Sequence, residues 1–148
     1  MTGATLRAAG PGDSPAVTDV YLGARREMRY LPVLHTDEET AEHFAGVVDR
    51  CRVELAERHG RVIGFAALHG SWLEHLNVHP DAQSEGVGSL LMTWAKEVLP
   101  KAIDLWVFQE NVRARAFYAA HGFAIVRLTD GDNEERQPDA HMRWEAES

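Results

Sequence analysis

The chain has 148 residues, enough for one domain that buries roughly two-thirds of its unfolded surface, so we predict a single domain over residues 1–148. Its composition, 45% hydrophobic and 26% charged, is typical of a soluble globular protein and excludes a fibrous or disordered one. The formal net charge of −8 argues against a protein that wraps nucleic acid or anionic lipid, because both partners demand a basic face.

No targeting or membrane segment is apparent. The first fourteen residues are small and polar, and no apolar run approaches the ~20 residues that a membrane span requires. We therefore expect a cytoplasmic protein. Cys51 is the only cysteine, so neither an internal disulfide nor a cysteine cluster for metal can form. The acidic excess either keeps the protein soluble or favours a cationic small molecule, and net charge alone leaves both open.

The chain begins with a short strand over 4–9, after which two helices are predicted. Ser14 followed by Pro15 is a helix-start signal, and one apolar face continues at spacings of three and four as far as Leu31. Thr36 and Glu39 then form a capping box for the second helix.

The remaining elements alternate between strands and helices. Alternation over 51–57 and a nearly continuous apolar run over 61–68 predict a hairpin whose second strand is interior. The elements that follow are strand 73–80, a helix from about 86 to 98, strand 102–108, helix 111–121, and strands 123–129 and 141–144. The order β-α-α-β-β-β-α-β-α-β-β predicts a mixed, partly parallel sheet of about seven strands with four helices, in three α/β/α layers.

Two glycines one residue apart, Gly86 and Gly88, stand where a strand gives way to an apolar helix. Unpaired N–H groups at the start of a helix bind phosphate oxygens, so the loop predicts a pyrophosphate site. From the spacing alone, a tight turn with close packing explains the glycines equally well. Ser89-Leu90 after Gly88 excludes a Walker loop, and Leu91 stands where a dinucleotide fingerprint needs its third glycine.

Two stretches of the chain together resemble a known family. They are LEHLNVHP over 73–80 followed by Gln83-x-x-Gly86-x-Gly88, and Asn111-x-x-Ala114-x-x-Phe117-Tyr118-x-x-x-Gly122-Phe123. Their order and separation resemble the two signature regions of the GNAT superfamily of acyl-CoA-dependent N-acetyltransferases. Each stretch is a weak signal alone, but both lie on the expected elements, and the element order agrees with that fold over nearly the whole chain.

The resemblance implies an acetyl-CoA site. In the family the amides of the glycine loop surround the pyrophosphate of coenzyme A, and the preceding strand pairs with the pantetheine arm through its free backbone groups. The first loop position is Gln83 rather than the commoner arginine, so binding leans more on backbone and helix dipole. The implied cofactor-binding residues are Leu76, Asn77, Val78, Gln83, Ser84, Glu85, Gly86, Val87, Gly88, Ser89, Asn111, Ala114 and Phe117.

Tyr118 matches the tyrosine that in this family lies by the coenzyme sulfur and acts as general acid. Its spacing alone favours a core tyrosine on the apolar face of its helix. Asn111 is likewise both a sound helix N-cap and, in the family, a frequent contact to the coenzyme.

The general base is less clearly marked. Glu74 is the leading candidate, because it lies on the strand that the resemblance places beside the thioester, and a water chain is the alternative. An exposed strand glutamate is more often simply solvated. His75 projects from the opposite face of that strand. Trp72 and Trp106 occupy positions where some relatives carry an acidic residue.

The stretch 30–40 joins the first two helices, and in the superfamily this region commonly forms a wall of the acceptor site. Tyr30 and His35 are the candidate substrate contacts. Asp37 and Glu38 are better explained as solvated acids of a capped loop. On a strand His75 and His79 span ~13 Å, too far to share an ion, so no metal is expected.

These observations predict an N-acetyltransferase in which a primary amine attacks acetyl-CoA directly within a ternary complex. The acceptor, a small amine, amino acid, antibiotic or peptide, stays open, as does an acyl group larger than acetyl. Dimers are common in the superfamily, which leaves a homodimer open as well. The alternative, from another class, is a non-catalytic coenzyme A-binding sensor or partner module with the same fold.

Overall fold

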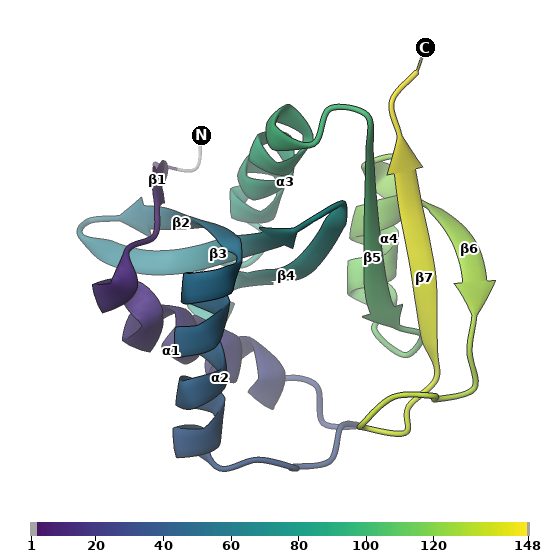
Figure 1. Ribbon diagram of the computed structural model, residues 1–148, viewed down its shortest axis with the longest axis horizontal. Coiled ribbons are helices and arrows are strands. Elements are labelled where there is room, and N and C mark those ends of the chain that lie inside the picture. The colour runs from purple at the N-terminus through teal and green to yellow at the C-terminus, as the bar shows by residue number, and fades with distance from the viewer. Residues whose placement is uncertain (1–2, 148) are drawn as a thin grey trace.

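The computed structural model describes residues 3–147, which form a seven-stranded sheet with helices on both faces (Figure 1). The strands are β1 (Thr5–Ala8), β2 (Arg52–Arg58), β3 (Arg61–His69), β4 (Trp72–Val78), β5 (Ala102–Phe108), β6 (Ala124–Leu128) and β7 (Asp139–Glu145). The helices are α1 (Ser14–Arg26), α2 (Asp37–Arg50), α3 (Val87–Val98), α4 (Val112–Ala120) and the 3₁₀ helices η1 (Pro11–Asp13) and η2 (Pro80–Ala82).

The sheet is mixed, with the strand order β1-β2-β3-β4-β5-β7-β6. Neighbours from β1 to β4 pair antiparallel, β4 and β5 are parallel, and β7 pairs antiparallel with both β5 and β6. The predicted α/β class and element order are therefore confirmed. So is the interior hairpin strand, because β3 is buried from Ile63 to Leu68.

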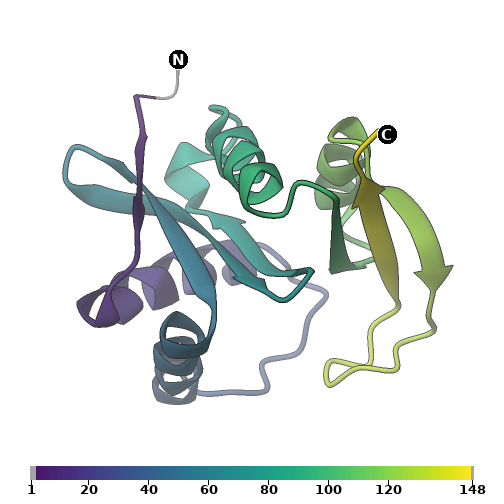
Figure 2. The same ribbon diagram turned by 45° about the horizontal axis from the view of Figure 1, so that its top comes forward.

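The core lies in two layers, one on each face of the sheet. In Figure 2 the purple and blue helices α1 and α2 lie below the sheet, and the teal and green helices α3 and α4 lie above it. Val17 and Val20 of α1 pack with Phe44 of α2 on the first face. Leu91 and Met92 of α3 occupy the second face. Among residues 3–147, no helix is both long and apolar enough to cross a bilayer.

The first helix ends earlier than its apolar face predicts. The prediction that it runs to Leu31 is wrong, because α1 stops at Arg26 and the chain continues in turns. The N–H of Met28 bonds to the carbonyl of Arg25 at 2.9 Å, and that of Leu31 to Met28 at 3.1 Å. Leu31 is still buried, so these i→i−3 turns deliver the same apolar side chain to the core that a helix would.

Of the two predicted helix caps, one is confirmed and one is wrong. The capping box of α2 is confirmed, with the Glu39 N–H donating to Thr36 Oγ1 at 3.1 Å and the Thr36 N–H to Glu39 Oε1 at 2.9 Å. Ser14 does not cap α1, because η1 runs directly into the helix and Asp13 precedes Ser14 at the cap position.

β4 and β5 separate along most of their length. Only Trp72 and Asp104 pair across them, and Figure 1 shows the two strands diverging from that end. The register of β4 against β3 skips Glu74, which is the extra residue of a β-bulge. A bulge bends its strand and strengthens the local twist, which directs β4 away from β5.

The closed end of this split is held by a buried carboxylate. Asp104 is 4% exposed and accepts hydrogen bonds from His141 Nε2 at 2.8 Å and from Arg143 Nη1 at 3.0 Å. Burial would raise the pKa of Asp104, but these hydrogen bonds outweigh it and the pKa is lowered. The rings of Trp72 and Trp106 stack with centroids 6.1 Å apart, and both pack against the ring of His141.

Candidate active site

A cavity of about 710 Å³, which we call the loop cavity, opens where β4, the start of α3 and α4 meet. It brings together most of the residues predicted to bind the cofactor, which come from two stretches distant in sequence. Those that line it are Leu76, Asn77, Val78, Gln83, Ser84, Gly86, Gly88, Ser89, Asn111, Ala114 and Phe117, and the predicted catalytic residue Tyr118 lines it with them.

Two predicted cofactor residues point their side chains elsewhere. Val87 is 1% exposed and belongs to the core, so only its backbone is available to a ligand. Glu85 is paired with Arg58 at 2.9 Å instead of facing the cavity.

The glycine loop leaves backbone donors at the mouth of the loop cavity. Gly86 has φ +87°, a left-handed conformation that glycine adopts without strain, and it turns the chain into α3. The first intrahelical bond of α3 runs from the Leu90 N–H to the Gly86 carbonyl at 3.1 Å, so the preceding N–H groups have no partner within the helix. A Cβ on Gly88 would lie 3.3 Å from the ring of Phe117, so this position permits close packing as well.

Arg113, which is not one of the defined positions of either sequence motif, also lines the loop cavity. Its guanidinium donates to Gln83 Oε1 at 2.9 Å and to Ser84 Oγ at 2.5 Å. Gln83 in turn donates to the Val78 carbonyl at 3.1 Å, which fixes its amide. A cation from α4 therefore lies against the first position of the loop, where the sequence offered only a neutral side chain.

Asn111 caps α4 as predicted, accepting from the Ala114 N–H at 3.2 Å. The ring of Tyr118 packs against Phe117 and Phe123, and burial raises its pKa to about 12. No described residue bonds to the Tyr118 hydroxyl. The phenol therefore keeps its proton throughout the neutral range.

Tyr30, predicted to meet the acceptor, lines the loop cavity rather than a separate substrate pocket. Its hydroxyl is buried and has no hydrogen-bond partner among the described residues. Burial and the nearby Glu110 raise the pKa of Tyr30, while Arg25 opposes them. A buried hydroxyl without a partner needs an explanation, and a bound ligand is one.

Glu74 lines neither of the two large cavities, and as the bulged residue of β4 it is exposed. Its charge reaches Cys51, where burial is the main cause of a raised thiol pKa and Glu74 adds to it. His75 packs on the α1–α2 side against Tyr21 and Phe44.

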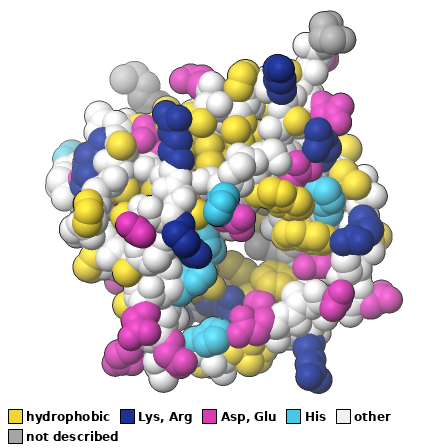
Figure 3. Space-filling model, in the orientation of Figure 1, with side chains coloured by type: hydrophobic (Ala, Val, Ile, Leu, Met, Phe, Trp, Pro, Cys, Tyr) yellow, Lys and Arg dark blue, Asp and Glu magenta, His cyan; other side chains and the backbone are white. Residues whose placement is uncertain are grey.

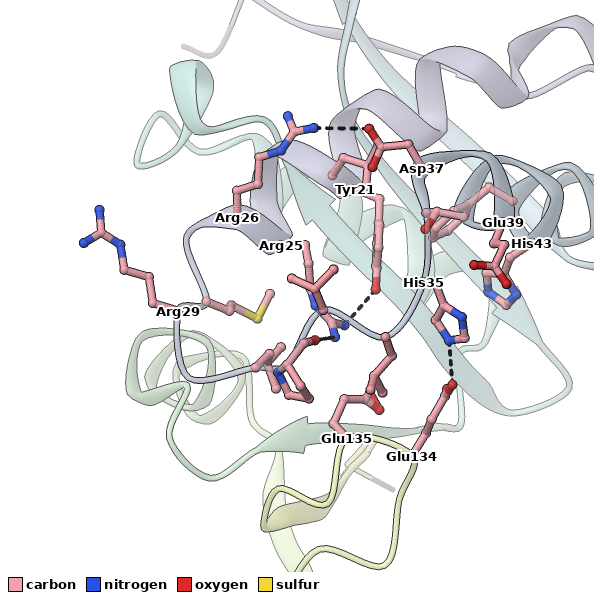
Figure 4. A pocket seen from close by; sticks show the side chains of 18 residues that line it. Tyr21, Arg25, Arg26, Arg29, His35, Asp37, Glu39, His43, Glu134 and Glu135 are labelled. Atoms are coloured by element: carbon pink, nitrogen blue, oxygen red, sulfur yellow. Dashed lines mark hydrogen bonds and ion pairs between the residues drawn. The ribbon is translucent and has the colours of Figure 1, made fainter.

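A second cavity of about 740 Å³, the α1–α2 cavity, lies between the end of α1, the 30–40 stretch and the β6–β7 loop. The space-filling view is hollowed near its centre, with histidine and acidic side chains around the opening (Figure 3). His35 lines this cavity, and its Nε2 lies 2.5 Å from Glu134 Oε1 (Figure 4). Met28 lines both cavities, so the two are neighbours.

Among residues 3–147, no three His, Cys, Asp or Glu side chains are grouped so that they could hold a metal ion. The polar groups of the loop cavity are backbone N–H groups, hydroxyls, amides, the guanidinium of Arg113 and, toward α1, the carboxylates of Glu27 and Glu110; around the glycine loop they are N–H groups, hydroxyls, amides and the guanidinium. Such a set is suited to an anionic, phosphate-bearing ligand.

Comparison with known proteins identifies the family. The Acetyltransferase (GNAT) family model matches residues 20–123, well over half of the chain. The chain belongs to the GNAT family. The matched range ends at Phe123 and contains the glycine loop, Arg113 and Tyr118.

The curated relatives are named either as peptidyl-lysine N-acetyltransferases or as uncharacterized N-acetyltransferases. The peptidyl-lysine N-acetyltransferase YiaC of Escherichia coli is 35% identical over 89 residues, which cover 60% of this chain and 60% of YiaC. The matched segments span 59–60% of the first two curated relatives.

Solved structures share the GNAT fold over nearly the full chain. A GCN5-related N-acetyltransferase from Rhodopseudomonas palustris superposes with a TM-score of 0.82 at 20% identity, covering 98% of this chain and 97% of the other. YncA from Salmonella typhimurium, solved with its cofactor acetyl-CoA, has a TM-score of 0.74 at 18% identity, covering 98% and 95%.

Proposed function

We propose that this protein is an acetyl-CoA-dependent N-acetyltransferase, formed by one domain, that transfers the acetyl group to a primary amine. The observation that carries the proposal is the cavity shared by the glycine loop, Arg113 and Tyr118. It combines hydrogen-bond donors for phosphate oxygens with a general acid at one site. Membership of the GNAT family and the acetyl-CoA bound to YncA support the same donor.

In this proposal the loop cavity holds the donor along its length. The N–H groups at the start of α3 and the guanidinium of Arg113 bind the pyrophosphate, where helix dipole and charge act together. The free edge of β4 at Leu76, Asn77 and Val78 pairs with the pantetheine amides, so that the thioester lies near Tyr118.

The reaction joins nitrogen to the acetyl carbon and breaks the carbon–sulfur bond. An ammonium first loses one proton, and the neutral amine attacks the thioester carbonyl. When the tetrahedral intermediate collapses, Tyr118 donates its proton to the departing sulfur, and the nitrogen loses its second proton. The phenol, held neutral by burial, is a donor at any physiological pH.

For the first proton we favour a water chain over direct abstraction by Glu74. The exposed, bulged position of Glu74 outside both cavities supports this choice. Solvent in the α1–α2 cavity, which adjoins the loop cavity at Met28, provides the route.

The test is thiol release from acetyl-CoA over a panel of amines, amino acids, aminoglycosides and lysine peptides, with Tyr118→Phe alongside. We expect release with one acceptor class and a loss of ten-fold or more in kcat for the variant, with acetyl-CoA affinity retained, because a general acid contributes roughly 10²–10⁴-fold. Acetyl-CoA binding without release for any acceptor would favour the sensor instead. Unchanged kcat in Tyr118→Phe would reject the acid role.

A further inference from the structure

The α1–α2 cavity contains two half-buried charges of opposite sign, on Arg25 and Glu135, that no described residue neutralises. The other acids of this cavity are already engaged: Glu39 in the capping box, Glu134 by His35, and Asp37 by Arg26 at 3.7 Å. A charged side chain that lines a cavity without an ion-pair partner is available to a ligand of opposite charge.

Arg25 is held in place by neutral groups. Its Nη1 donates to the Tyr21 hydroxyl at 3.0 Å and its Nη2 to the Pro32 carbonyl at 3.4 Å, and no carboxylate among residues 3–147 lies within ion-pair distance. Figure 4 shows the guanidinium between α1 and the 30–35 segment, whereas Arg29 points away from the other labelled side chains. A guanidinium oriented in advance by two neutral acceptors is suited to bind a carboxylate.

Arg25 also lies close to the wall between the two cavities. Its charge acts on Tyr30, which lines the loop cavity and whose buried hydroxyl has no partner. Because the α1–α2 cavity adjoins the loop cavity at Met28, a group bound to Arg25 lies in the cavity next to the proposed thioester site.

We propose that the acceptor amine also carries a carboxylate, which Arg25 binds in the α1–α2 cavity while the amine reaches the thioester in the adjoining loop cavity. The substrate class is a free amino acid or a peptide in which the acceptor lysine neighbours an acidic residue. This inference rests on the proposed function, since it defines the acceptor of that same transfer.

The experiment compares matched acceptors that differ only in this carboxylate. L-lysine is compared with L-lysinamide, and an N-terminally blocked Lys-Glu peptide with its Lys-Gln counterpart, by thiol release and kcat/KM. We expect the acid to be preferred over its amide by roughly ten-fold or more in at least one pair, the range for a charge-assisted hydrogen bond. The pair that discriminates identifies the source of the carboxylate.

Variants assign the preference to Arg25. In Arg25→Gln the ratio of acid to amide should fall to about 1–2, whereas Arg29→Gln, which removes the same charge four residues along the chain, should keep it. Acetyl-CoA affinity measured for both variants verifies that each is folded. Equal use of acid and amide by the unaltered protein, or a preference that survives in Arg25→Gln, would overturn the inference.

Calorimetry of the same acceptors with the coenzyme A complex separates this inference from the proposed function. If no acceptor releases thiol but the acids bind more tightly in an Arg25-dependent way, the carboxylate site stands and catalysis fails. If thiol is released without discrimination, catalysis stands and the carboxylate site fails. Neither release nor selective binding would reject both.

Discussion

At the scale of single residues, the site depends on a cation that no motif predicts. Arg113 reaches the glycine loop from α4 and hydrogen-bonds Gln83 and Ser84, thirty and twenty-nine positions earlier in the chain. Ser84 has φ +65°, an uncommon conformation for a side chain other than glycine, and the contact with Arg113 holds it.

Replacing Arg113 by Gln should weaken acetyl-CoA binding by about ten-fold, because one charge-assisted contact to phosphate is lost. The salt dependence of the dissociation constant should decrease at the same time. Titration calorimetry at two salt concentrations measures both, with Arg127→Gln on β6 as a charge-matched control. An unchanged affinity in Arg113→Gln would remove Arg113 from the site.

His75 makes stability depend on pH. Burial among aromatic rings, with His43 adding to it, lowers the pKa of His75 to about 4. Because the folded pKa lies below the unfolded value of about 6.5, the stabilisation is present above pH 6.5 and is lost as pH falls toward 4.

From pH 7 to pH 5 the unfolding free energy of the natural chain should fall by about 2 kcal/mol more than that of His75→Phe. The phenyl ring suits the aromatic surroundings and cannot take up a proton. Urea unfolding at the two pH values provides the comparison, and parallel losses in both proteins would refute the role of His75.

At the scale of elements, the start of α3 combines backbone donors with tight packing. Gly88 lies on the first turn of α3 and lines the loop cavity, and a side chain there would press against the ring of Phe117, which lines the same cavity. A substitution at Gly88 should therefore disturb both the start of α3 and the loop cavity.

Gly88→Glu should abolish measurable acetyl-CoA binding, a loss of at least about 100-fold, because it adds bulk and negative charge where phosphate would lie. Gly12→Glu is the matched control, since the space around Gly12 in η1 is open. Isothermal titration of both variants is the measurement, and binding retained by Gly88→Glu would disprove the phosphate assignment.

The sequence predicts the existence and order of these elements well, because each has a strong apolar period or a cap. It places the end of α1 five residues too far, since i→i−3 turns bury Leu31 as a helix would. The β-bulge at Glu74 leaves no local signal, because it arises from pairing with β3. The roles of Arg113 and Arg25 could not be predicted from the sequence, because the side chains and cavities that they contact are brought together only by the fold.

At the scale of the whole molecule, two half-sheets meet at the Asp104 cluster. The carboxylate links β5 to His141 and Arg143 of β7 and to Ser71 beside β4, at 3.3 Å from the Ser71 hydroxyl. Since β4 and β5 pair nowhere else, this cluster is the polar contact between the halves, beside the hydrophobic core that the two halves share.

Asp104→Asn should therefore lower the unfolding free energy by about 1–3 kcal/mol, as a buried acceptor loses its charge while its donors stay. Asp81→Asn removes an exposed carboxylate with partners at 3.5–3.6 Å and should change stability by less than about 0.5 kcal/mol. Urea denaturation distinguishes the two, and equal stability of Asp104→Asn and the natural chain would contradict the role of the cluster.

The divergence of β4 from β5 also bears on aggregation. Strands that separate inside a sheet leave rows of unpaired N–H and C=O groups, and such edges capture extended segments of other chains. Most proteins protect the outer edges of a sheet, whereas here the open edge lies in its interior beyond Trp72 and Asp104. Acetyl-CoA bound along β4 would cover that edge. In the proposed function, the acetyl donor would therefore also reduce self-association of the protein.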